Sequence, residues 1–534
     1  MQIARPKIRA LLGSFLILAV PAQFVAASPL KDIQLNPVGT YSAGAFNEGA
    51  AEIVAHDPKT QRLFVVNGAT SSIDVLDVNN PTAPTLLFSI SLTPYGGQAN
   101  SVAVDKGVVA AAVEAVVKTD PGKVVFFDAG APDETRAFIS AVQVGALPDM
   151  LTFTPNGKYV LVANEGEPND DYSIDPEGSV SIVDLKHGAS RVTQSDVRTA
   201  TFTAFNGATL DSSIRIFGPG ASVAEDLEPE YIAVSHDSKT AWITLQENNA
   251  LGILNIKEGA FTELRGLGFK NHSLPGNALD ASDRDNAINI ANWPVFGMYQ
   301  PDAVASFRYR GDTFLITANE GDARDYDAFA EEVRVSSLKL DPIAFPDATF
   351  LKNSARLGRL NVTKTLGNPD GDGDYDALYA FGARSFSIRD ASGALVFDSG
   401  DQIEQITAQF LPAFFNSSND SNNSFDTRSD NKGPEPEGVT VGELYGRTYA
   451  FIGLERIGGV IVYDVTVPTS PRFIQYVNNK DFSGDAEAGT AGDLGPEGLL
   501  FIRAGDSPTH QPLLVVANEV SGTTTVYEIS RMDK

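Results

Sequence analysis

The stretch from Pro148 to Glu165 reads PDMLTFTPNGKYVLVANE, and its layout decides the fold. It opens with Pro-Asp, continues as a short apolar run, turns at Pro155-Asn-Gly157, and passes through a second apolar run to Asn-Glu. A third run, Val180 to Asp184, follows. Short apolar runs separated by turn residues are typical of antiparallel strands. The stretch therefore predicts one unit of a repeating β structure.

Variants of this layout recur along the chain. The units start near residues 51, 99, 148, 229, 301, 436 and 496. Further runs, such as Leu86–Leu92 and Arg472–Val477, bring several units to about four strands, which is the pattern of propeller blades. We therefore predict an all-β fold, a seven-bladed β-propeller over residues 28–534. A ring of six or eight blades and a pair of β-sandwiches are the alternatives.

The seventh unit has no room for a fourth strand before the chain ends. We expect residues Ile33 to Ala43 to supply that strand and close the ring. For the fifth unit we expect the third strand at Val333 to Leu340. Insertions are expected at residues 258–298, between the fourth and fifth units, and at residues 341–433, between the fifth and sixth.

Composition restricts the chemistry. The chain has 534 residues, no cysteine and a formal net charge of -28. The absence of cysteine excludes disulfides, thiolate metal sites and thiol nucleophiles. The negative charge argues against nucleic acid as a partner, because binding phosphates requires clustered Lys and Arg. The same charge favours cations as partners.

Residues 1–27 have the features of a secretory signal peptide. A basic start precedes the apolar run Ala10–Val20, and small residues follow at Ala26-Ala27. A membrane anchor is the alternative, but the apolar run is too short to span a bilayer. We therefore expect a periplasmic or extracellular protein with no membrane insertion after cleavage.

Acidic residues recur at two positions of the repeat. One position starts the first strand and the other ends the second, so an antiparallel pair brings both to the same face of the propeller. All units should direct these side chains at one mouth of the central channel. The acidic residues at these positions are Glu52, Glu114, Asp149, Glu165, Glu230, Glu247, Asp302, Glu320, Glu437, Glu455, Glu497 and Glu519.

So many carboxylates at one channel mouth require something to offset their mutual repulsion. Two carboxylates about 5 Å apart repel by roughly 3 kcal/mol at an effective dielectric constant of 20. The acids must therefore bind protons or hold cations, unless they are simply solvated loop charges, which is the alternative. Oxygen ligands without cysteine and with only five histidines favour several Ca²⁺ ions, with Mg²⁺, Mn²⁺ or Fe³⁺ also possible.

Other motifs add candidate residues. Asp370, Asp372 and Asp374 alternate with glycine as in calcium loops, although a flexible acidic turn has the same pattern and the spacing is not that of an EF-hand. Arg324 lies in the acidic run Asn319–Asp325, and Arg384 lies in the run Phe381–Phe386. Both are candidates to hold a phosphoryl group beside metals, and structural ion pairs are the alternative. His272 is a candidate acid or base.

Three stretches carry a resemblance to a known family. They are the unit at residues 148–168, the run LDASDRD at 279–285, and DGDYDALYAFGARSFSI at 372–388. Together they resemble the choice-of-anchor I family, which is similar to mesenchyme-specific cell-surface glycoproteins of biomineralising cells and has some members labelled alkaline phosphatase-like. The layout also resembles two groups of propeller phosphatases that hold several metals at a channel mouth, the calcium-dependent phytases and the secreted calcium/iron alkaline phosphatases.

Two functions follow as hypotheses. The first is an exported metal-dependent phosphoesterase, with Ca²⁺ at the channel mouth, alone or together with iron, and a phosphorylated small molecule as substrate. The second is a non-catalytic calcium-binding surface or matrix protein whose partners are mineral ions. Both use the same carboxylates and differ in whether a substrate is turned over.

Overall fold

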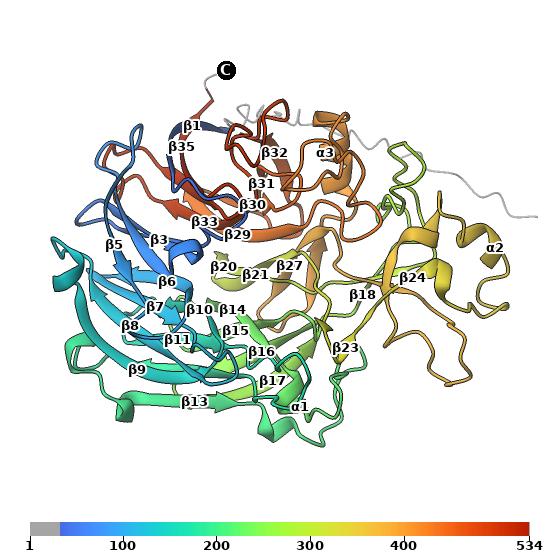
Figure 1. The fold of residues 1–534 in the computed structure, drawn as a ribbon, viewed down its shortest axis with the longest axis horizontal. Helices are drawn as coiled ribbons and strands as arrows, with labels where there is room; N and C mark the ends of the chain where they lie inside the picture. The colour runs from blue at the N-terminus through green and yellow to red at the C-terminus, as the bar shows by residue number, and fades with distance from the viewer. Residues whose placement is uncertain (1–31, 533–534) are drawn as a thin grey trace, which may run out of the picture.

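The computed structural model describes residues 32–532, which form an all-β structure (Figure 1). Seven sheets have four strands, one has five and one has two. The predicted β-propeller fold is confirmed, because the four-stranded sheets are arranged around one centre as blades. The predicted signal peptide lies outside the described residues.

The first three four-stranded sheets follow the chain order. Their strands are β2 (Val54–Asp57), β3 (Arg62–Asn67), β4 (Ser72–Asp77) and β5 (Thr85–Ser91); β6 (Ala99–Asp105), β7 (Val108–Val113), β8 (Pro121–Asp128) and β9 (Phe138–Ala146); and β10 (Pro148–Phe153), β11 (Tyr159–Asn164), β12 (Ser179–Asp184) and β13 (Val197–Thr201). The next two sheets comprise β14 (Pro229–Val234), β15 (Thr240–Leu245), β16 (Ala250–Asn255) and β17 (Ala260–Gly266); and β20 (Val304–Tyr309), β21 (Asp312–Asn319), β27 (Ser385–Asp390) and β28 (Leu395–Asp398). The last two comprise β29 (Pro436–Leu444), β30 (Arg447–Leu454), β31 (Val460–Asp464) and β32 (Arg472–Val477); and β33 (Pro496–Ile502), β34 (Leu513–Asn518), β35 (Thr523–Arg531) and β1 (Ile33–Ser42).

The first strand of each unit lies innermost. Contacts pass from β2 to β6, β10, β14, β20, β29 and β33, and from β33 back to β2. The ring is closed by β1, which pairs antiparallel with β35 from Ile33 opposite Arg531 to Ser42 opposite Thr523. This is the closure predicted from the sequence at Ile33 to Ala43.

The second strand of each unit is apolar on both faces because each sheet packs between two others. In β3, for example, every residue after Arg62 is buried. Separate apolar clusters fill the spaces between neighbouring sheets; Phe64 of β3 and Phe127 of β8 belong to one of them. A ring of sheets that share cores in this way places the innermost strands around a central channel.

The fifth unit differs from the prediction. Its third and fourth strands are β27 and β28, while the expected third strand at Val333 to Leu340 lies elsewhere, partly in the short strand β24 (Glu332–Arg334). An insertion therefore interrupts this unit after β21. The strands β27 and β28 lie inside the predicted insertion 341–433, of which only residues 399–433 follow the fifth unit. Strand propensity alone cannot identify the third strand of this unit, because Val333–Leu340 and Ser385–Asp390 are both strand-like. In addition, β17 lies inside the predicted insertion 258–298.

The inserted segments build a separate sheet at one side of the ring, drawn mostly in yellow in Figure 1. It consists of β18 (Phe269–Asn271), β19 (Phe296–Met298), β26 (Tyr379–Ala380), β25 (Asn361–Thr363) and β24. The two-stranded sheet comprises β22 (Asp325–Tyr326) and β23 (Phe329–Ala330). The inserted sheet has its own apolar core, which includes Trp293 and Leu357.

Helices are few and short. They are α1 (Val223–Asp226), α2 (Ala348–Leu351) and α3 (Gln402–Phe410). Single 3₁₀ turns occur at Gly68–Thr70, Glu134–Arg136, Ala189–Arg191, Gln194–Asp196, Thr203–Phe205, Val335–Ser337 and Leu357–Arg359. Within residues 32–532, no helix has the length and apolar character needed to cross a bilayer.

Ring closure generates a stability prediction. The Leu35 side chain of β1 is 3% exposed and packs in the core between the last two sheets. Replacing Leu35 by Ala should lower the free energy of unfolding by about 2 to 5 kcal/mol, because it leaves a cavity in that core. Gln34→Ala, at an exposed position of the same strand, should change it by less than about 0.5 kcal/mol. Urea unfolding measures both; equal effects would contradict the role of β1.

Candidate metal centre

The first acid of a unit sits in a β-bulge. In four units the strand pairing shifts just after the opening proline, which leaves the acid and the next residue out of register. A bulge bends the strand and redirects the side chain of the extra residue. The acids in these bulges are Asp149, Glu230, Glu437 and Glu497.

The second acid is fixed beside the first by the backbone. The N–H of Glu165 donates to the carbonyl of Leu147 at 2.9 Å, and the N–H of Glu455 donates to that of Glu435 at 2.9 Å. Each acceptor immediately precedes the opening proline and has a left-handed backbone, with φ of 44° at Leu147 and 52° at Glu435. This conformation is costly for a residue other than glycine and is maintained only where the surrounding structure enforces it. It holds both acids of the unit at the channel.

The acids converge on a central cavity of about 360 Å³. The predicted acids that line it are Asp149, Glu165, Glu230, Asp302, Glu320, Glu437, Glu455, Glu497 and Glu519. Asp322 joins them, and Lys432 and Arg456 supply the positive charge among the described lining residues. The predicted acids Glu52, Glu114 and Glu247 are not lining residues, although the charges of Glu52 and Glu247 act on Glu497 and Glu230. The convergence predicted from the repeat is therefore present.

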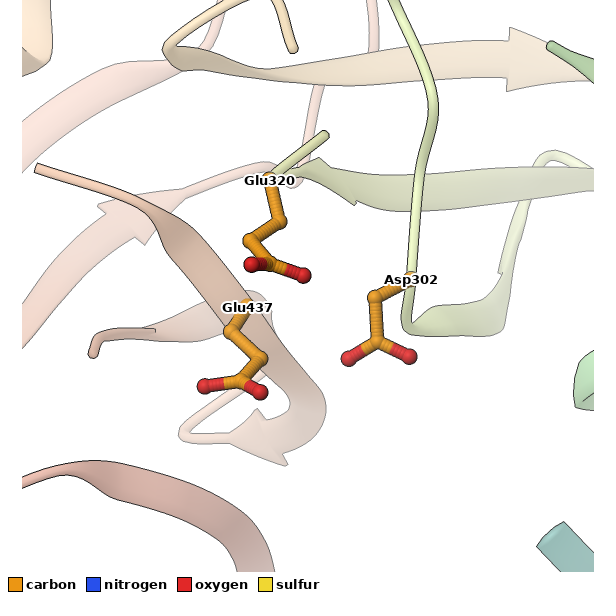
Figure 2. A group of neighbouring side chains, drawn as sticks. All are labelled: Asp302, Glu320 and Glu437. Carbon is orange, nitrogen blue, oxygen red and sulfur yellow. The ribbon is translucent and has the colours of Figure 1, made fainter. Parts of the chain in front are cut away.

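One compact acidic group in the cavity is Asp302, Glu320 and Glu437, which come from three different strand ends (Figure 2). One carboxylate oxygen of each lies within 4.8 Å of the others. Glu320 accepts hydrogen bonds from Lys432 Nζ at 2.6 Å and from Gln246 Nε2 at 2.9 Å. Oxygens at this separation can share one cation, since Ca²⁺–O distances are about 2.3 to 2.6 Å.

A second acidic group in the cavity wall is already neutralised. Glu435 lies near Glu320 and Glu455, and it pairs with Lys432 at 3.1 Å and with Arg456 at 3.0 Å. Burial alone would raise the pKa of Glu435, but the charges of Lys432, Arg428 and Arg456 outweigh it and hold the pKa below its ordinary value. This group is an ion-pair network, and it leaves little need for a metal.

Other carboxylates in the cavity have no such partner. Glu230 Oε2, Glu437 Oε2 and Glu497 Oε2 are buried and accept no hydrogen bond from the described residues. An unsatisfied buried polar group costs about 1 to 3 kcal/mol, and more when it is charged. A hard cation bound beside any one of these oxygens would satisfy it, so the residues present fit calcium-type ions.

Burial and mutual repulsion favour protonation of the acids when no cation is present. Burial, with the charge of Glu519, raises the pKa of Glu52 to about 8. Burial raises the pKa of Asp149 to about 7 and that of Glu247 to about 8. The pKa of Glu437 is also well above its ordinary value because of burial and the charge of Glu455.

The three residues predicted to be catalytic lie outside the cavity lining. Arg324 is buried and forms ion pairs with Asp226 and Glu228. Arg384 pairs with Glu404 at 2.7 Å. The structural alternative therefore describes both arginines.

His272 is also held by structural contacts. It is 1% exposed, and its Nδ1 donates to the Asn277 carbonyl at 2.6 Å. Burial, with the charge of Lys270, holds the pKa of His272 well below its ordinary value. A role as acid or base at the central cavity has no support in this geometry.

The predicted calcium loop is held by its own backbone. The N–H of Asp372 donates to Asp370 Oδ1, and the N–H of Asp374 donates to Asp372 Oδ1. Asp374 also pairs with Lys339 at 2.9 Å and lies near Asp341 and Asp376, not in a group with Asp370 and Asp372. The arrangement matches the alternative of an acidic turn.

Sequence reasoning missed Gln246, Lys432 and Arg456, which line the cavity, and Glu435, which pairs with the last two. Lys432 lies inside the predicted insertion 341–433, and Glu435 lies just before the sixth repeat unit. The run Pro434-Glu-Pro-Glu437 carried a usable signal, because it places a second acid beside the repeated Pro-Glu.

The raised pKa values predict how the metal-free protein responds to pH. Glu52, Asp149 and Glu247 have pKa values of about 7 to 8 in the folded state, against an unfolded value of about 4. The folded chain therefore binds more protons than the unfolded chain, and stability falls as pH rises from about 4 to about 8. Thermal melting in chelator should show a lower Tm at pH 8 than at pH 5.5. An unchanged or higher Tm at pH 8 would contradict the raised pKa values of these buried acids.

Comparison with known proteins gives two curated relatives. The chain is 31% identical to Gigasin-3a of Magallana gigas over 34% of this chain and 68% of that protein. It is 27% identical to the mesenchyme-specific cell surface glycoprotein of Strongylocentrotus purpuratus over 45% of this chain. It spans only 35% of the length of the latter protein.

Solved structures with a similar arrangement include the hydrazine synthase of Kuenenia stuttgartiensis and the WD40 domain of coronin from Toxoplasma gondii. The first has a TM-score of 0.46 at 13% identity and covers 92% of this chain and 99% of its own. The second has a TM-score of 0.42 at 9% identity and covers 94% and 88%. The sequence model of the choice-of-anchor I domain matches residues 52–468. With most of its length matched by that model, the chain belongs to the choice-of-anchor I family.

Proposed function

We propose that this protein is a surface or exported propeller that binds hard cations, first of all Ca²⁺, in its central cavity, and that it acts by binding rather than by hydrolysis. The observation that carries the proposal is the set of buried, unpartnered carboxylate oxygens of Glu230, Glu437 and Glu497 in a cavity lined mainly by acids. Two lining cations, Lys432 and Arg456, leave most of that negative charge uncompensated.

Calcium suits this donor set better than the other hard cations. Ca²⁺ accepts six to eight oxygen ligands in flexible geometry, whereas Mg²⁺ demands a near-ideal octahedron and keeps much of its water. Carboxylates from several separate sheets line the cavity, and such a set can adapt to the looser requirement. Calcium sites of extracellular modules have dissociation constants on the order of 10⁻⁴ to 10⁻³ M, which is the range we expect.

The proposed location rests on the relatives. A cell surface glycoprotein is among them, and the family is defined by a choice-of-anchor domain. We infer that this chain also works outside the cytoplasm, where calcium is abundant. The seven four-stranded sheets are, on this proposal, the seven blades of the ring, and the five-stranded and two-stranded sheets are insertions.

Phosphoester hydrolysis receives less support. Arg324, Arg384 and His272 do not line the cavity, and the cations that do, Lys432 and Arg456, are paired with carboxylates. No positive group is left free among the described lining residues to hold a phosphate.

We therefore expect that the protein has no metal-dependent turnover of p-nitrophenyl phosphate. Turnover that is present with Ca²⁺ and lost on addition of a chelator would restore the phosphoesterase hypothesis.

Calcium binding can be tested with two substitutions and one control. In Asp302→Asn/Glu437→Gln, Ca²⁺ affinity measured by calorimetry should fall by about tenfold or more, which corresponds to about 1.4 kcal/mol. The metal-free variant should melt at or above the temperature of the parent, because two repelling groups have been neutralised. Asp171→Asn, at an exposed turn, should leave Ca²⁺ affinity unchanged. Equal affinity in all three proteins would contradict the proposed site.

A further inference from the structure

A second buried polar cluster lies outside the channel. It forms where α3, the run Leu279–Asp285 and the loop 415–431 meet, beside the inserted sheet. Glu404 of α3 is 1% exposed, and its Oε1 accepts hydrogen bonds from Arg384 Nη1 at 2.7 Å and from Asn416 Nδ2 at 2.8 Å. None of these residues lines the central cavity.

Several oxygens in this region, among them those of Ser417 and Asn431, have no partner among the described residues, and two of them carry the argument. They are Asn416 Oδ1 and Asp426 Oδ2, in side chains that are 0% and 2% exposed. Both side chains contact the hydroxyl of Ser429, which donates to Asp426 Oδ1 at 2.6 Å and accepts from Asn416 Nδ2 at 2.9 Å. Because Asn416 Nδ2 donates to both Glu404 and Ser429, the orientation of the amide is fixed and its carbonyl oxygen is left unsatisfied.

The surrounding charge is negative. Asp280 is fully buried, and its two oxygens accept only backbone N–H groups, from Ser282 and Asn289. Burial raises the pKa of Asp426 to about 8, and the charge of Asp280 adds to the shift. Arg384, the buried cation of the cluster, is committed to Glu404 and to backbone carbonyls, including those of Asp280 and Ser429.

We propose that Asp426 and Asn416, beside the buried carboxylate of Asp280, form a second cation site that takes Ca²⁺. The donors are a carboxylate and an amide carbonyl, and the buried Ser417 hydroxyl nearby in sequence is also unpartnered. Oxygen donors of these mixed kinds are those that Ca²⁺ uses in proteins. A bound ion would satisfy the two orphaned oxygens and would hold the inserted segment against α3.

The site is independent of the central cavity, so either proposal can fail alone. The competing arrangement is a protonated Asp426 whose hydroxyl donates to Asn416 Oδ1. That arrangement needs no ion. It predicts that Asn replaces Asp426 without any change in metal binding.

The chain contains a natural reporter for this site. It has two tryptophans, and Trp293 Nε1 donates to the carbonyl of Leu279, the residue before Asp280. Trp242 donates to Ala391, next to the fifth four-stranded sheet. Terbium is a hard trivalent substitute for Ca²⁺ that emits when a nearby indole is excited.

We expect tryptophan-excited terbium emission from the full chain, with competition by excess Ca²⁺. Trp293→Phe and Asp426→Asn should abolish it, while Trp242→Phe and Glu437→Gln should retain it. Equilibrium dialysis should find one Ca²⁺ fewer per chain in Asp426→Asn. Because this count does not depend on the position of the indole, it separates loss of the ion from loss of emission caused by movement of Trp293. Emission and Ca²⁺ count that both survive in Asp426→Asn would overturn the site. If Asp426→Asn does not fold, Asn416→Ala must give the same two losses, and retention of both would overturn the proposal equally.

Discussion

Repulsion between carboxylates that the fold forces together is the constraint on which this molecule depends. In four units an acid sits in a bulge after the opening proline, and backbone hydrogen bonds fix a second acid beside the first at Glu165 and Glu455. Seven sheets in a closed ring then direct these pairs inward. Hydrophobic cores between the sheets supply the stability that permits such crowding. Burial, reinforced by the charges of neighbouring acids, raises the pKa values of Glu230, Glu437 and Glu497, so their charged forms are unfavourable without a counter-charge.

The protein compensates part of this charge itself. Lys432 and Arg456 neutralise the Glu435 side of the cavity, whereas Glu230, Glu437 and Glu497 on other strands retain unsatisfied oxygens. The cavity therefore has a permanently paired wall and a wall open to an added cation. The buried cluster around Asp426 repeats this division, with Arg384 committed to Glu404 and two oxygens left over.

Much of the ring could be predicted from sequence because the repeat is regular. Pro-acid openings mark the innermost strands, Asn-Glu endings mark the strands next to them, and the missing outer strand of the last unit indicates Ile33–Ala43. The fifth unit could not be resolved, since Val333–Leu340 and Ser385–Asp390 are both strand-like and only packing decides between them. Lys432 lies 112 residues from Glu320 and Arg384 lies 20 residues from Glu404, so these two pairings depend on tertiary contacts that no local pattern reveals.

The most direct test of the account counts protons released when the protein binds Ca²⁺. Carboxyls such as Asp149 and Glu52, with pKa values of about 7 and about 8, are partly protonated at pH 7 and must lose protons as a cation enters. Titration calorimetry in two buffers of different ionisation enthalpy measures this number. The account predicts net proton release on binding at pH 7 that shrinks at pH 9. Absence of Ca²⁺ binding, or binding without proton release at pH 7, would contradict it.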